Sequence, residues 1–536
     1  MSDREGRPVL YPPTFWQLVD DAAVQHPERA IVVDDYGRGY TNLQFRDAAL
    51  RVAAGLADLG VRSGTVVSWQ LPTVIESLVL LVALARLDAV QNPIIPVLRD
   101  REVRFITAEV ATEFYIVPSS WRGFDHAGLA RAIGDERGFR VLVVDLDNAP
   151  APGALRLPQG DPATLAPPSS SQPHADMPVR WIYHTSGTTS DPKGARHTDS
   201  SVMHGASALI ERLGIDDRDV YPVAFPVTHI GGVVILTTFL VTGARIVLFD
   251  AFDPVTSPAR FAAHRPTLLG TAVPFFNAYI AAQQQHGDDP LFTDLRACMG
   301  GGASVPTEIH FALQRTFGVA GVVGSWGLTE FPNATCARCD DSADVMTGSV
   351  GRPGTGVEVR VVDAHGLDVA PGGEGELVLR GPQQLVGYVN AELDVSGFFP
   401  DRWFRTGDLG RLDVGGNVWI TGRLKEIVIR NAENISVLEI ENALSRHPDV
   451  LEAAVIGMPD ARTGERVCAV VVTRAATTLT LEALRAHCEA LGLAKHKCPE
   501  QIEHVEALPR NAMGKVQKPQ LRAAYLPRDV VGQGPT

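Results

Sequence analysis

The stretch TSGTTSDPKG, from Thr185 to Gly194, combines residue types that can bind phosphate groups. It contains five hydroxyl side chains, two glycines and a lysine, and it follows the apolar, strand-like segment VRWIYH. Glycines let the backbone approach a ligand closely, while hydroxyl groups, backbone N–H groups and lysine donate to an anion. A Walker A loop is excluded because no glycine directly precedes Lys193. On its own, a loop of this composition is as often a flexible surface turn as a phosphate site.

Four further short motifs follow in order and contain side chains that suit a nucleotide. They are SWGLTE (Ser325–Glu330), WFRTGD (Trp403–Asp408), GRLKE (Gly422–Glu426) and LPRNAMGK (Leu508–Lys515). The indole of Trp326 can offer a flat face to a base, and the carboxylate of Asp408, which only accepts, can bind two hydroxyl groups. Taken singly, these residues are equally well explained as a core aromatic and a turn or cap residue.

The five motifs together resemble the signature of the adenylate-forming superfamily, which includes acyl-CoA synthetases, peptide-synthetase adenylation domains and firefly luciferase. The resemblance covers nearly the whole chain. Within the superfamily, TSGTTSDPKGARHTD together with RNAENIS is most similar to cyclohexanecarboxylate–CoA ligase and related acyl-CoA ligases. The resemblance implies an AMP- and pyrophosphate-forming acid–thiol ligase.

The implied reaction has two halves. A carboxylate attacks the α-phosphorus of ATP to give an acyl-adenylate and pyrophosphate, and a thiol, usually that of CoA, then displaces AMP. The expected cofactors are ATP, Mg²⁺ and CoA, and the expected partner is a small carboxylic acid. Two alternatives stay open: transfer to the phosphopantetheine of a carrier protein, and a non-catalytic nucleotide-binding sensor. The presence of Lys515, Glu330 and Asp408 argues against the sensor.

The resemblance assigns each motif a part of the nucleotide. Trp326 is expected to face adenine, Asp408 to bind the ribose, Thr329 to contact the α-phosphate, and Glu330 with Thr188 to hold Mg²⁺, a cation that prefers oxygen ligands. The expected ATP- and AMP-binding residues are Thr185, Ser186, Gly187, Thr188, Thr189, Lys193, Gly301, Gly302, Ala303, Ser325, Trp326, Gly327, Asp408 and Arg423. Ser190 stands where glycine is common, which we expect to change loop mobility slightly.

Lys515 resembles the catalytic lysine of the superfamily. A positive charge between the carboxylate and the α-phosphate would offset the charge that builds up as the two anions meet. The resemblance implies a large domain at residues 1–424, which binds ATP and the acid, and a small, mobile domain at residues 425–536, which carries Lys515 and the CoA channel. Lys425 occupies the hinge position, about which the small domain is expected to rotate between the two half-reactions.

The acid is expected to lack an α-amine. Relatives that activate amino acids carry an aspartate near the segment Phe225–Gly232, which here contains no acidic residue. Instead His229 matches the histidine of acyl- and aryl-CoA ligases, and it is counted with Lys515 and Thr329 among the expected catalytic residues. The expected acyl pocket contains His229, Phe275, Asn277, Gly301, Ser325 and Phe331. A mostly apolar lining suits a cyclic, aryl or medium-chain acid.

The thiol acceptor depends on a turn in the small domain. Many CoA ligases have two glycines where this chain has Asn431 and Ala432, and the resemblance places this turn beside the pantetheine channel. The extra methyl group of Ala432 predicts a narrower channel. Both CoA and a carrier protein therefore remain possible acceptors.

These motifs need elements that bring them together, and the hydrophobic pattern predicts an α/β fold. Short β-branched runs at residues 30–35, 141–146 and 244–250 predict strands, and residues 42–60 predict a helix that ends at their final glycine. Alternation of this kind indicates parallel sheets. Residues 148–178 predict a surface connection, because they are rich in proline, serine and alanine.

The last hundred or so residues predict a separate small α+β domain. A helix, two strands and a second helix follow in that order after the segment ITGRLKEIVIRN. The short, charged GRLKE segment suits a domain junction, since boundaries fall in exposed polar stretches. The expected fold is therefore a large N-terminal α/β domain of several subdomains, followed by this small domain.

Composition narrows the class of protein further. A net charge of −14 over 536 residues makes nucleic acid or an anionic membrane an improbable main partner. The most apolar run, residues 77–90, is interrupted by Arg86 and Asp88, and it predicts a buried helix instead of a membrane span. Six cysteines do not form a disulfide framework in so long a chain, which suggests a reduced, cytoplasmic protein. The Cys336–Cys339 pair lacks a second ligand pair, so we interpret it as a chance occurrence in a loop.

Overall fold

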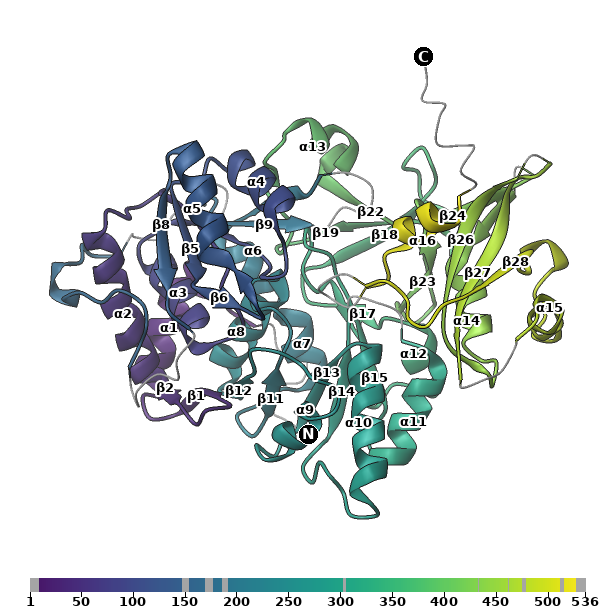
Figure 1. Ribbon diagram of the computed structural model, residues 1–536, viewed down its shortest axis with the longest axis horizontal. Helices are drawn as coiled ribbons and strands as arrows, with labels where there is room; N and C mark the ends of the chain where they lie inside the picture. Colours follow the sequence, from purple (N-terminus) through teal and green to yellow (C-terminus); the bar gives the residue numbers. More distant parts are fainter. Residues whose placement is uncertain are drawn as a thin grey trace.

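The computed structural model describes residues 9–146, 154–168, 177–185, 191–301, 305–431, 433–460, 462–474, 479–510 and 515–526. In Figure 1, the chain before β24 forms the larger part of the molecule, and the elements from β24 onward gather on one side of it. The α/β fold with a large N-terminal part and a small C-terminal part confirms the predicted fold class.

The largest sheet contains the strands on either side of the TSGTTSDPKG motif, which is called the phosphate-loop motif below. Its order is β20 (Gly387–Tyr388), β10 (Lys193–His197), β9 (Trp181–Thr185), β4 (Val90–Pro93), β3 (Val66–Trp69), β5 (Phe114–Pro118) and β8 (Arg140–Val144). The strands from β9 to β8 pair in parallel, as predicted, whereas β10 pairs antiparallel with both β9 and β20. The motif therefore connects the two strands of a hairpin.

Two further sheets contain parallel strands. One has the order β11 (Val220–Val223), β12 (Arg245–Leu248), β1 (Ala30–Asp34) and β2 (Gly39–Thr41), with β2 antiparallel. The other has the order β13 (Leu268–Thr271), β14 (Ala297–Gly300), β15 (Val322–Trp326), β16 (Thr335–Cys336) and β17 (Arg352–Pro353), with β16 and β17 antiparallel. The three strands predicted in the sequence correspond to β1, β8 and β12.

An antiparallel sheet carries the RTGD and GRLKE motifs. Its order is β18 (Glu358–Val362), β19 (Gly375–Arg380), β22 (Trp403–Leu412) and β21 (Phe398–Phe399), and β23 (Val418–Arg423) also pairs with β22. The register places Asp408 directly opposite Arg423. Two residues that are fifteen positions apart thus become cross-strand neighbours. A short separate hairpin joins β6 (Ser120–Trp121) and β7 (Phe124–Asp125).

Helices cover the sheets of the large part. They are α1 (Phe15–Gln25), α2 (Asn42–Asp58), α3 (Ile75–Arg86), α4 (Asp100–Glu109), α5 (His126–Arg137), α6 (Asp199–His204), α7 (Ser207–Leu213), α8 (Ile230–Thr242), α9 (Ser257–Ala262), α10 (Val273–His286), α11 (Thr307–Phe317), α12 (Ala343–Gly348) and α13 (Glu392–Gly397). Every residue of α3 is buried, so the predicted buried helix is confirmed. The helix predicted at 42–60 corresponds to α2, and Gly60 follows it with a φ of 101°.

The C-terminal part is built on a sheet of its own. The strand order is β25 (Glu433–Ser436), β24 (Ile427–Arg430), β27 (Gly464–Thr473) and β26 (Val450–Asp460), with β28 (Gln501–His504) beside β27. Its helices are α14 (Val437–Leu444), α15 (Leu481–Ala490) and α16 (Lys518–Tyr525). The elements α14, β26, β27 and α15 follow the predicted order of helix, strand, strand and helix. The expected junction at residue 424 falls in the turn between β23 and β24.

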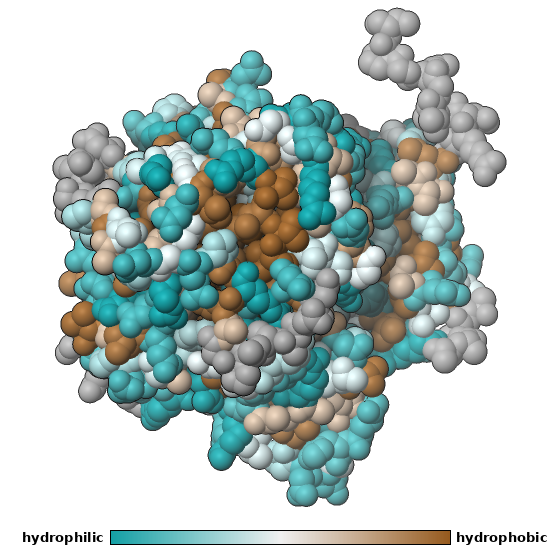
Figure 2. All heavy atoms as spheres, turned by 60° about the vertical axis from the view of Figure 1, so that its left-hand side comes forward, coloured by the Kyte–Doolittle hydropathy of each residue, from teal (hydrophilic) through white to brown (hydrophobic). Residues whose placement is uncertain are grey.

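The hydrophobic core is divided along the chain. Each cluster of buried apolar side chains that the structure describes draws its members either from residues up to 420 or from residue 428 onward. Figure 2 shows a mostly hydrophilic outer face with hydrophobic side chains gathered in a hollow. None of the helices in the described ranges has the length and apolar character needed to cross a membrane.

Candidate functional site

A cleft of about 1720 Å³ lies between the large part and the C-terminal part. It is lined by the ends of β9, β15, β22 and β23 together with segments of α10, α11 and α14. The expected site residues that line it are Thr185, Asn277, Ser325, Trp326, Gly327, Asp408, Arg423 and Lys515. Residues from five separate motifs therefore meet in one place.

The hairpin of β9 and β10 presents the phosphate-loop motif to this cleft. Thr185, the last residue of β9, pairs with Lys193, the first residue of β10. The ammonium of Lys193 lies 5.6 Å from the centre of the Tyr388 ring, an arrangement that favours a cation. Ser186, Gly187, Thr188, Thr189 and Ser190 lie outside the described residues, so their expected roles stay predictions.

Asp408 is held between an indole and a guanidinium. The Trp326 Nε1–H donates to one carboxylate oxygen at 2.8 Å, and Arg423 Nε lies 2.9 Å from the other. Burial raises the pKa of Asp408, while Arg423 and Trp326 act in the opposite direction. Trp326 is 6% exposed and packs in the core, and it also lines the cleft. Its expected contact with adenine stays a prediction.

Glu330 is a buried carboxylate near two lysines. The Tyr388 hydroxyl donates to its Oε1 at 2.9 Å, and burial raises the pKa of Glu330, against the effects of Lys193 and Lys515. A hard-oxygen ligand beside ammonium groups that would bind phosphates fits a Mg²⁺ ion bound together with a nucleotide. The residues present therefore suit the metal that the sequence implied.

Thr329 is positioned through its backbone. Its carbonyl accepts a hydrogen bond from His197 Nε2 at 2.9 Å, while His197 Nδ1 lies 3.0 Å from Ser201 Oγ. Burial lowers the pKa of His197 to about 4, so its imidazole is neutral near pH 7. His197 is the last residue of β10, which begins at Lys193. Its hydrogen bond to Thr329 therefore connects the hairpin of β9 and β10 to the Thr329–Glu330 segment.

Lys515 reaches the cleft from the C-terminal part. Burial and Arg423 lower the pKa of its ammonium, while Asp408, Glu330 and Glu426 oppose this effect. These carboxylates belong to three different motifs, so Lys515 lies within electrostatic reach of all of them. Lys518, one turn further along, pairs with Glu426 at 2.5 Å and with Glu441 at 3.0 Å.

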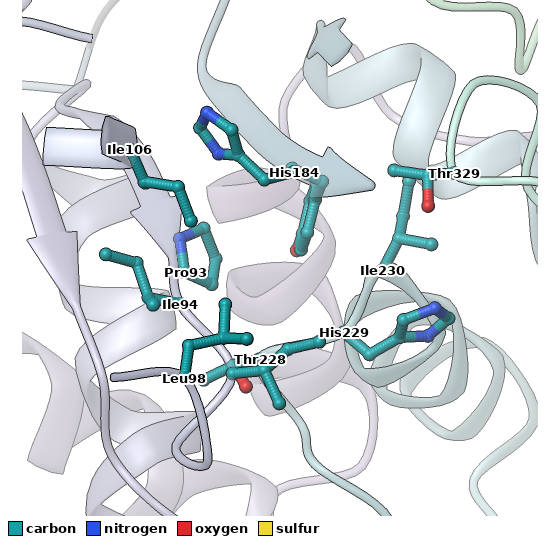
Figure 3. A pocket seen from close by; sticks show the side chains of 11 residues that line it. Pro93, Ile94, Leu98, Ile106, His184, Thr228, His229, Ile230 and Thr329 are labelled. Atoms are coloured by element: carbon teal, nitrogen blue, oxygen red, sulfur yellow. The ribbon is translucent and has the colours of Figure 1, made fainter. Parts of the chain in front are cut away.

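His229 caps the start of α8 and lines a small pocket that shares Leu98 and His184 with the cleft. Its Nδ1 accepts a hydrogen bond from the Gly231 N–H at 3.1 Å, so the proton of the neutral ring resides on Nε2. Burial lowers the pKa of His229 to about 4, with a further contribution from Lys515. Figure 3 shows His229 and Thr329 on one side of a small pocket, opposite the apolar side chains of Ile94, Leu98 and Ile106.

Comparison with known proteins agrees with this geometry. Residues 19–389 match the family described as AMP-binding enzyme, and residues 439–515 match the AMP-binding enzyme C-terminal domain.

The chain belongs to the AMP-binding enzyme family.

Relatives of this AMP-binding enzyme align over almost its full length. It is 31% identical to the medium-chain fatty-acid–CoA ligase of Escherichia coli, with 96% of this chain and 90% of the relative covered. It is 33% identical to the sulfoacetate–CoA ligase of Cupriavidus necator, with 94% and 96% covered. It is also 33% identical to the salicyl-AMP ligase / salicyl-S-ArCP synthetase of Mycobacterium tuberculosis, with 94% and 89% covered.

A solved structure shows the same architecture. ATP-bound MatB from Rhodopseudomonas palustris superimposes with a TM-score of 0.84 at 26% identity, covering 96% of this chain and 99% of that one. The adenylate-forming fold predicted from the five motifs is thus confirmed.

Not every residue expected in the acyl pocket of this AMP-binding enzyme reaches the cleft. Phe331 is fully buried in the core with Trp326, and Phe275 stacks on Phe252 at 4.0 Å, so neither is among the residues that line the cleft. Asn277 and Ser325 do line it, whereas Gly301 is not among its lining residues and His229 lines the small adjoining pocket instead. The expected contacts of Phe331 and Phe275 with the acid stay predictions.

Gly301 lies where two strand ends approach each other. A Cβ at this position would come within 2.9 Å of Ser325 Oγ, so a larger residue would require this hydroxyl to move. Ser325 Oγ in turn donates to the Gly300 carbonyl at 3.1 Å. Gly302 and Ala303 lie outside the described residues, and their expected contacts with the nucleotide stay predictions.

The expected hinge and CoA turn lie at the edges of the C-terminal part. Lys425 is exposed in the turn between β23 and β24. Asn431 occupies the turn between β24 and β25 with a φ of 51°, and its N–H donates to the Thr463 carbonyl at 2.8 Å. Asparagine tolerates this left-handed conformation better than most residues, which explains how it replaces glycine here. Ala432 lies outside the described residues.

The segment that contains Cys336 and Cys339 does not line the cleft. Cys336 is buried in β16, and burial raises the pKa of its thiol to about 12. Burial also raises the pKa of Cys339. Thiols with raised pKa values are poor nucleophiles and poor metal ligands. In the described ranges, no three histidine, cysteine or acidic side chains are grouped to hold a metal ion.

Sequence reasoning missed Tyr388 and His197. Both contact the Thr329–Glu330 segment, yet Tyr388 follows it by 58 residues and His197 precedes Thr329 by 132. Tyr388 stands outside the quoted motifs, and His197 lies in the longer stretch TSGTTSDPKGARHTD, where it was given no role. The pairing of β20 with β10, which a single sequence does not reveal, is the feature that brings Tyr388 into the site.

Proposed function

We propose that this AMP-binding enzyme is an ATP-dependent acid–thiol ligase. It activates a carboxylic acid that lacks an α-amine as the acyl-adenylate, releases pyrophosphate, and transfers the acyl group to the thiol of CoA with release of AMP. Because the reaction consumes ATP and CoA, we propose that it takes place in the cytoplasm.

The observation that carries this proposal is the position of Lys515. Its ammonium lies in the same cleft as Asp408 and Arg423, and it interacts electrostatically with Asp408, Glu330 and His229. A cation here can lower the barrier to the approach of a carboxylate to the α-phosphate. A protein that only senses nucleotide has no need for such a residue.

The other residues each bind a different part of the nucleotide or of the acid. Asp408 accepts from the ribose hydroxyls, Lys193 binds the outer phosphates, and the neutral His229 donates from Nε2 to the oxygen of the acid. Glu330 would hold Mg²⁺, which supplies charge neutralisation to the phosphates when bound. Closure of the C-terminal part over the cleft excludes water from the acyl-adenylate.

A monocarboxylic acid with an apolar body suits the cleft best. Ile95, Leu98, Phe105, Val273 and Pro274 line the cleft near the expected acid site. The segment 225–232 supplies no carboxylate to pair with an ammonium group. Relatives named for medium-chain fatty acid and for salicylate support an aliphatic or aryl acid. We therefore propose a medium-chain, cyclic or aryl substrate.

A carrier-protein phosphopantetheine is the second candidate acceptor. Ala432 replaces a glycine of many CoA ligases, and the relative named salicyl-S-ArCP synthetase supports this alternative. Two relatives named as CoA ligases at 31% and 33% identity support CoA as the primary acceptor.

Release of pyrophosphate across a panel of acids tests the proposal. Medium-chain, cyclic and aryl monocarboxylates should each be compared with amino acids, with and without CoA. We expect pyrophosphate only with acids that lack an α-amine, and acyl-CoA only when CoA is present. Adenylate formation without acyl-CoA, but with loading of a carrier protein, would establish the second acceptor. Tight ATP binding without pyrophosphate release for any acid would contradict an enzyme.

A further inference from the structure

Tyr388 lies between the two charged groups that flank the polyphosphate site. Its hydroxyl donates to Glu330 Oε1 at 2.9 Å, and its ring centre lies 5.6 Å from Lys193 Nζ. Tyr388 is 5% exposed and Glu330 is buried as well, so their hydrogen bond is shielded from water, whereas Lys193 is half-buried. One residue thus contacts an anion through its edge and a cation through its face.

The backbone around Tyr388 fixes this arrangement from two directions. Tyr388 is the register partner of Ala195 on β10, two residues after Lys193. The Leu385 N–H donates to the Glu330 carbonyl at 2.9 Å, so the same segment also holds the backbone of the carboxylate residue. The segment 385–388 therefore couples the hairpin of β9 and β10 to Glu330.

A half-buried ammonium near a buried carboxylate would be expected to pair with it directly. Lys193 and Glu330 interact electrostatically, yet in the described part of the chain they form no direct ion pair, and the Tyr388 hydroxyl takes one oxygen of the carboxylate instead. A direct pair would occupy both groups and leave neither free for a ligand. The hydroxyl holds the carboxylate, and the ring face attracts the ammonium through a weaker cation–π contact that a phosphate group can displace.

We propose that Tyr388 is a positioning residue that keeps Lys193 and Glu330 apart, so that the enzyme binds the polyphosphate of ATP preferentially in its Mg²⁺-bound form. This inference rests on the proposed function, because it takes Glu330 as the metal-binding carboxylate. Without the hydroxyl, the buried carboxylate loses its donor and can turn toward the ammonium. The carboxylate then leaves the position in which it would hold the metal, while the ring stays over Lys193.

The interpretation as a simple core aromatic predicts something different. Tyr388 also packs among buried apolar side chains, and any buried hydroxyl needs a partner. If packing were its only role, removal of the hydroxyl would lower stability without changing how Mg²⁺ affects nucleotide binding.

Tyr388→Phe separates the two interpretations because it removes the hydroxyl and keeps the ring over Lys193. Titration calorimetry of ATP with Mg²⁺ and with EDTA measures the gain in affinity that Mg²⁺ provides. We expect that gain to fall about tenfold in the variant, the loss of one hydrogen bond to a charged group, while metal-free ATP binds with unchanged affinity. The Mg²⁺ concentration for half-maximal pyrophosphate release should rise in parallel, with the KM for the acid unchanged.

Tyr115→Phe is the matched control. The Tyr115 hydroxyl also donates to a buried side chain, Gln70 Oε1 at 2.6 Å, but on the far side of the sheet order from β10. Its loss should lower stability by a similar amount and leave the Mg²⁺ gain intact. A double-mutant cycle with Glu330→Gln adds a second readout, since Tyr388→Phe should change nothing further once the carboxylate is absent.

The outcomes distinguish this inference from the proposed function. Equal Mg²⁺ gains in wild type, Tyr388→Phe and Tyr115→Phe would overturn the positioning role, as would additive effects in the cycle. If the unmodified enzyme shows neither a Mg²⁺ gain nor acid-dependent pyrophosphate release, the proposed function itself fails. Melting curves of each variant exclude unfolding as the cause.

Discussion

At the scale of single residues, Lys515 is expected to serve one half-reaction only. Its ammonium lines the cleft and interacts electrostatically with Asp408, Glu330 and His229, around the place where the acid and the α-phosphate would meet. Lys515→Ala should slow acyl-adenylate formation by orders of magnitude, because a cation aimed at developing charge is lost. A supplied acyl-adenylate should still be converted to the thioester at nearly the normal rate.

Single-turnover assays of each half-reaction measure this difference. Lys495→Ala is the matched control, since Lys495 is an exposed lysine of the same C-terminal part. Equal loss in both halves would show that Lys515 holds the domain structure together and does not act on the first step.

Asp408 is expected to determine affinity for the nucleoside and not the choice of acid. Its oxygens face Trp326 and Arg423, with register fixed by the pairing of β22 and β23. Asp408→Ala leaves the ribose hydroxyls and Arg423 without their acceptor, at a cost of about 1–3 kcal/mol. The KM for ATP should rise accordingly, with an unchanged order of preferred acids. An altered acid preference at normal ATP affinity would place Asp408 in the acyl pocket.

The buried imidazole of His197 should make folding stability depend on pH. Burial lowers its pKa to about 4, from about 6.5 in an unfolded chain. As the pH falls below about 6.5, the unfolded chain binds a proton that the folded protein does not bind until near pH 4. This group therefore lowers stability progressively over that interval, by about 2 kcal/mol between pH 7 and pH 5.

Urea unfolding of His197→Gln checks this expectation. The glutamine amide can also donate to the Thr329 carbonyl, but it does not titrate. The variant should lose about 2 kcal/mol less than the wild type between pH 7 and pH 5. Parallel losses in the two proteins would mean that His197 is not the titrating group.

At the scale of elements, the hairpin of β24 and β25 is expected to matter only for thiol transfer. Asn431 in its turn adopts a left-handed conformation, and Ala432 follows it where many CoA ligases have glycine. Ala432→Leu adds three carbons, and overpacking a confined passage typically costs about 1–3 kcal/mol, or about ten- to hundredfold in rate. Acid-dependent pyrophosphate release should stay normal while acyl-CoA formation falls.

Separate assays of pyrophosphate and acyl-CoA measure the effect. Ala432→Gly, which restores the residue common in CoA ligases, is the control and should transfer at least as fast as the wild type. Equal damage to both half-reactions in Ala432→Leu would show that the turn is structural and that the channel lies elsewhere.

The elements themselves could be predicted where the signal is local. The strands β1, β8 and β12 and the helices α2 and α3 follow from short apolar runs, because periodicity and glycine position are encoded within a few residues. The pairing of β20 with β10 could not be predicted, since it joins segments almost two hundred residues apart. Phe331 and Phe275 do not line the cleft, and their expected contacts with the acid stay predictions.

The site could be predicted to the same extent. The residues named in advance lie in short motifs that the sequence alone displays. Those that line the cleft are Thr185, Ser325, Trp326, Asp408, Arg423 and Lys515. Tyr388 and His197 act on those residues through hydrogen bonds made possible only by the tertiary fold. Contacts of this supporting kind leave no local pattern.

At the scale of the whole molecule, the divided core has a thermodynamic consequence. Every described hydrophobic cluster falls either before residue 421 or after residue 427, and the polar contacts across this line include Ser436 with Thr421, and Arg446 with Glu308 at 3.9 Å. Without ligand, the two parts should melt as separate cooperative units, giving two heat-absorption peaks in calorimetry. The smaller unit should melt first, since a smaller fraction of its surface is buried.

A ligand that contacts both parts should merge the two calorimetric peaks into one. Lys193 and Lys515 belong to different units, so a bound acyl-adenylate analogue must be released before either unit unfolds. At a hundredfold excess over Kd it would add about 2.7 kcal/mol to both units at once. A single, sharper transition is therefore expected, whereas AMP with Lys515→Ala should leave two. Binding in the cleft would then couple the unfolding of the two parts reversibly. The number of transitions would show whether one part or both parts bind the reaction intermediate.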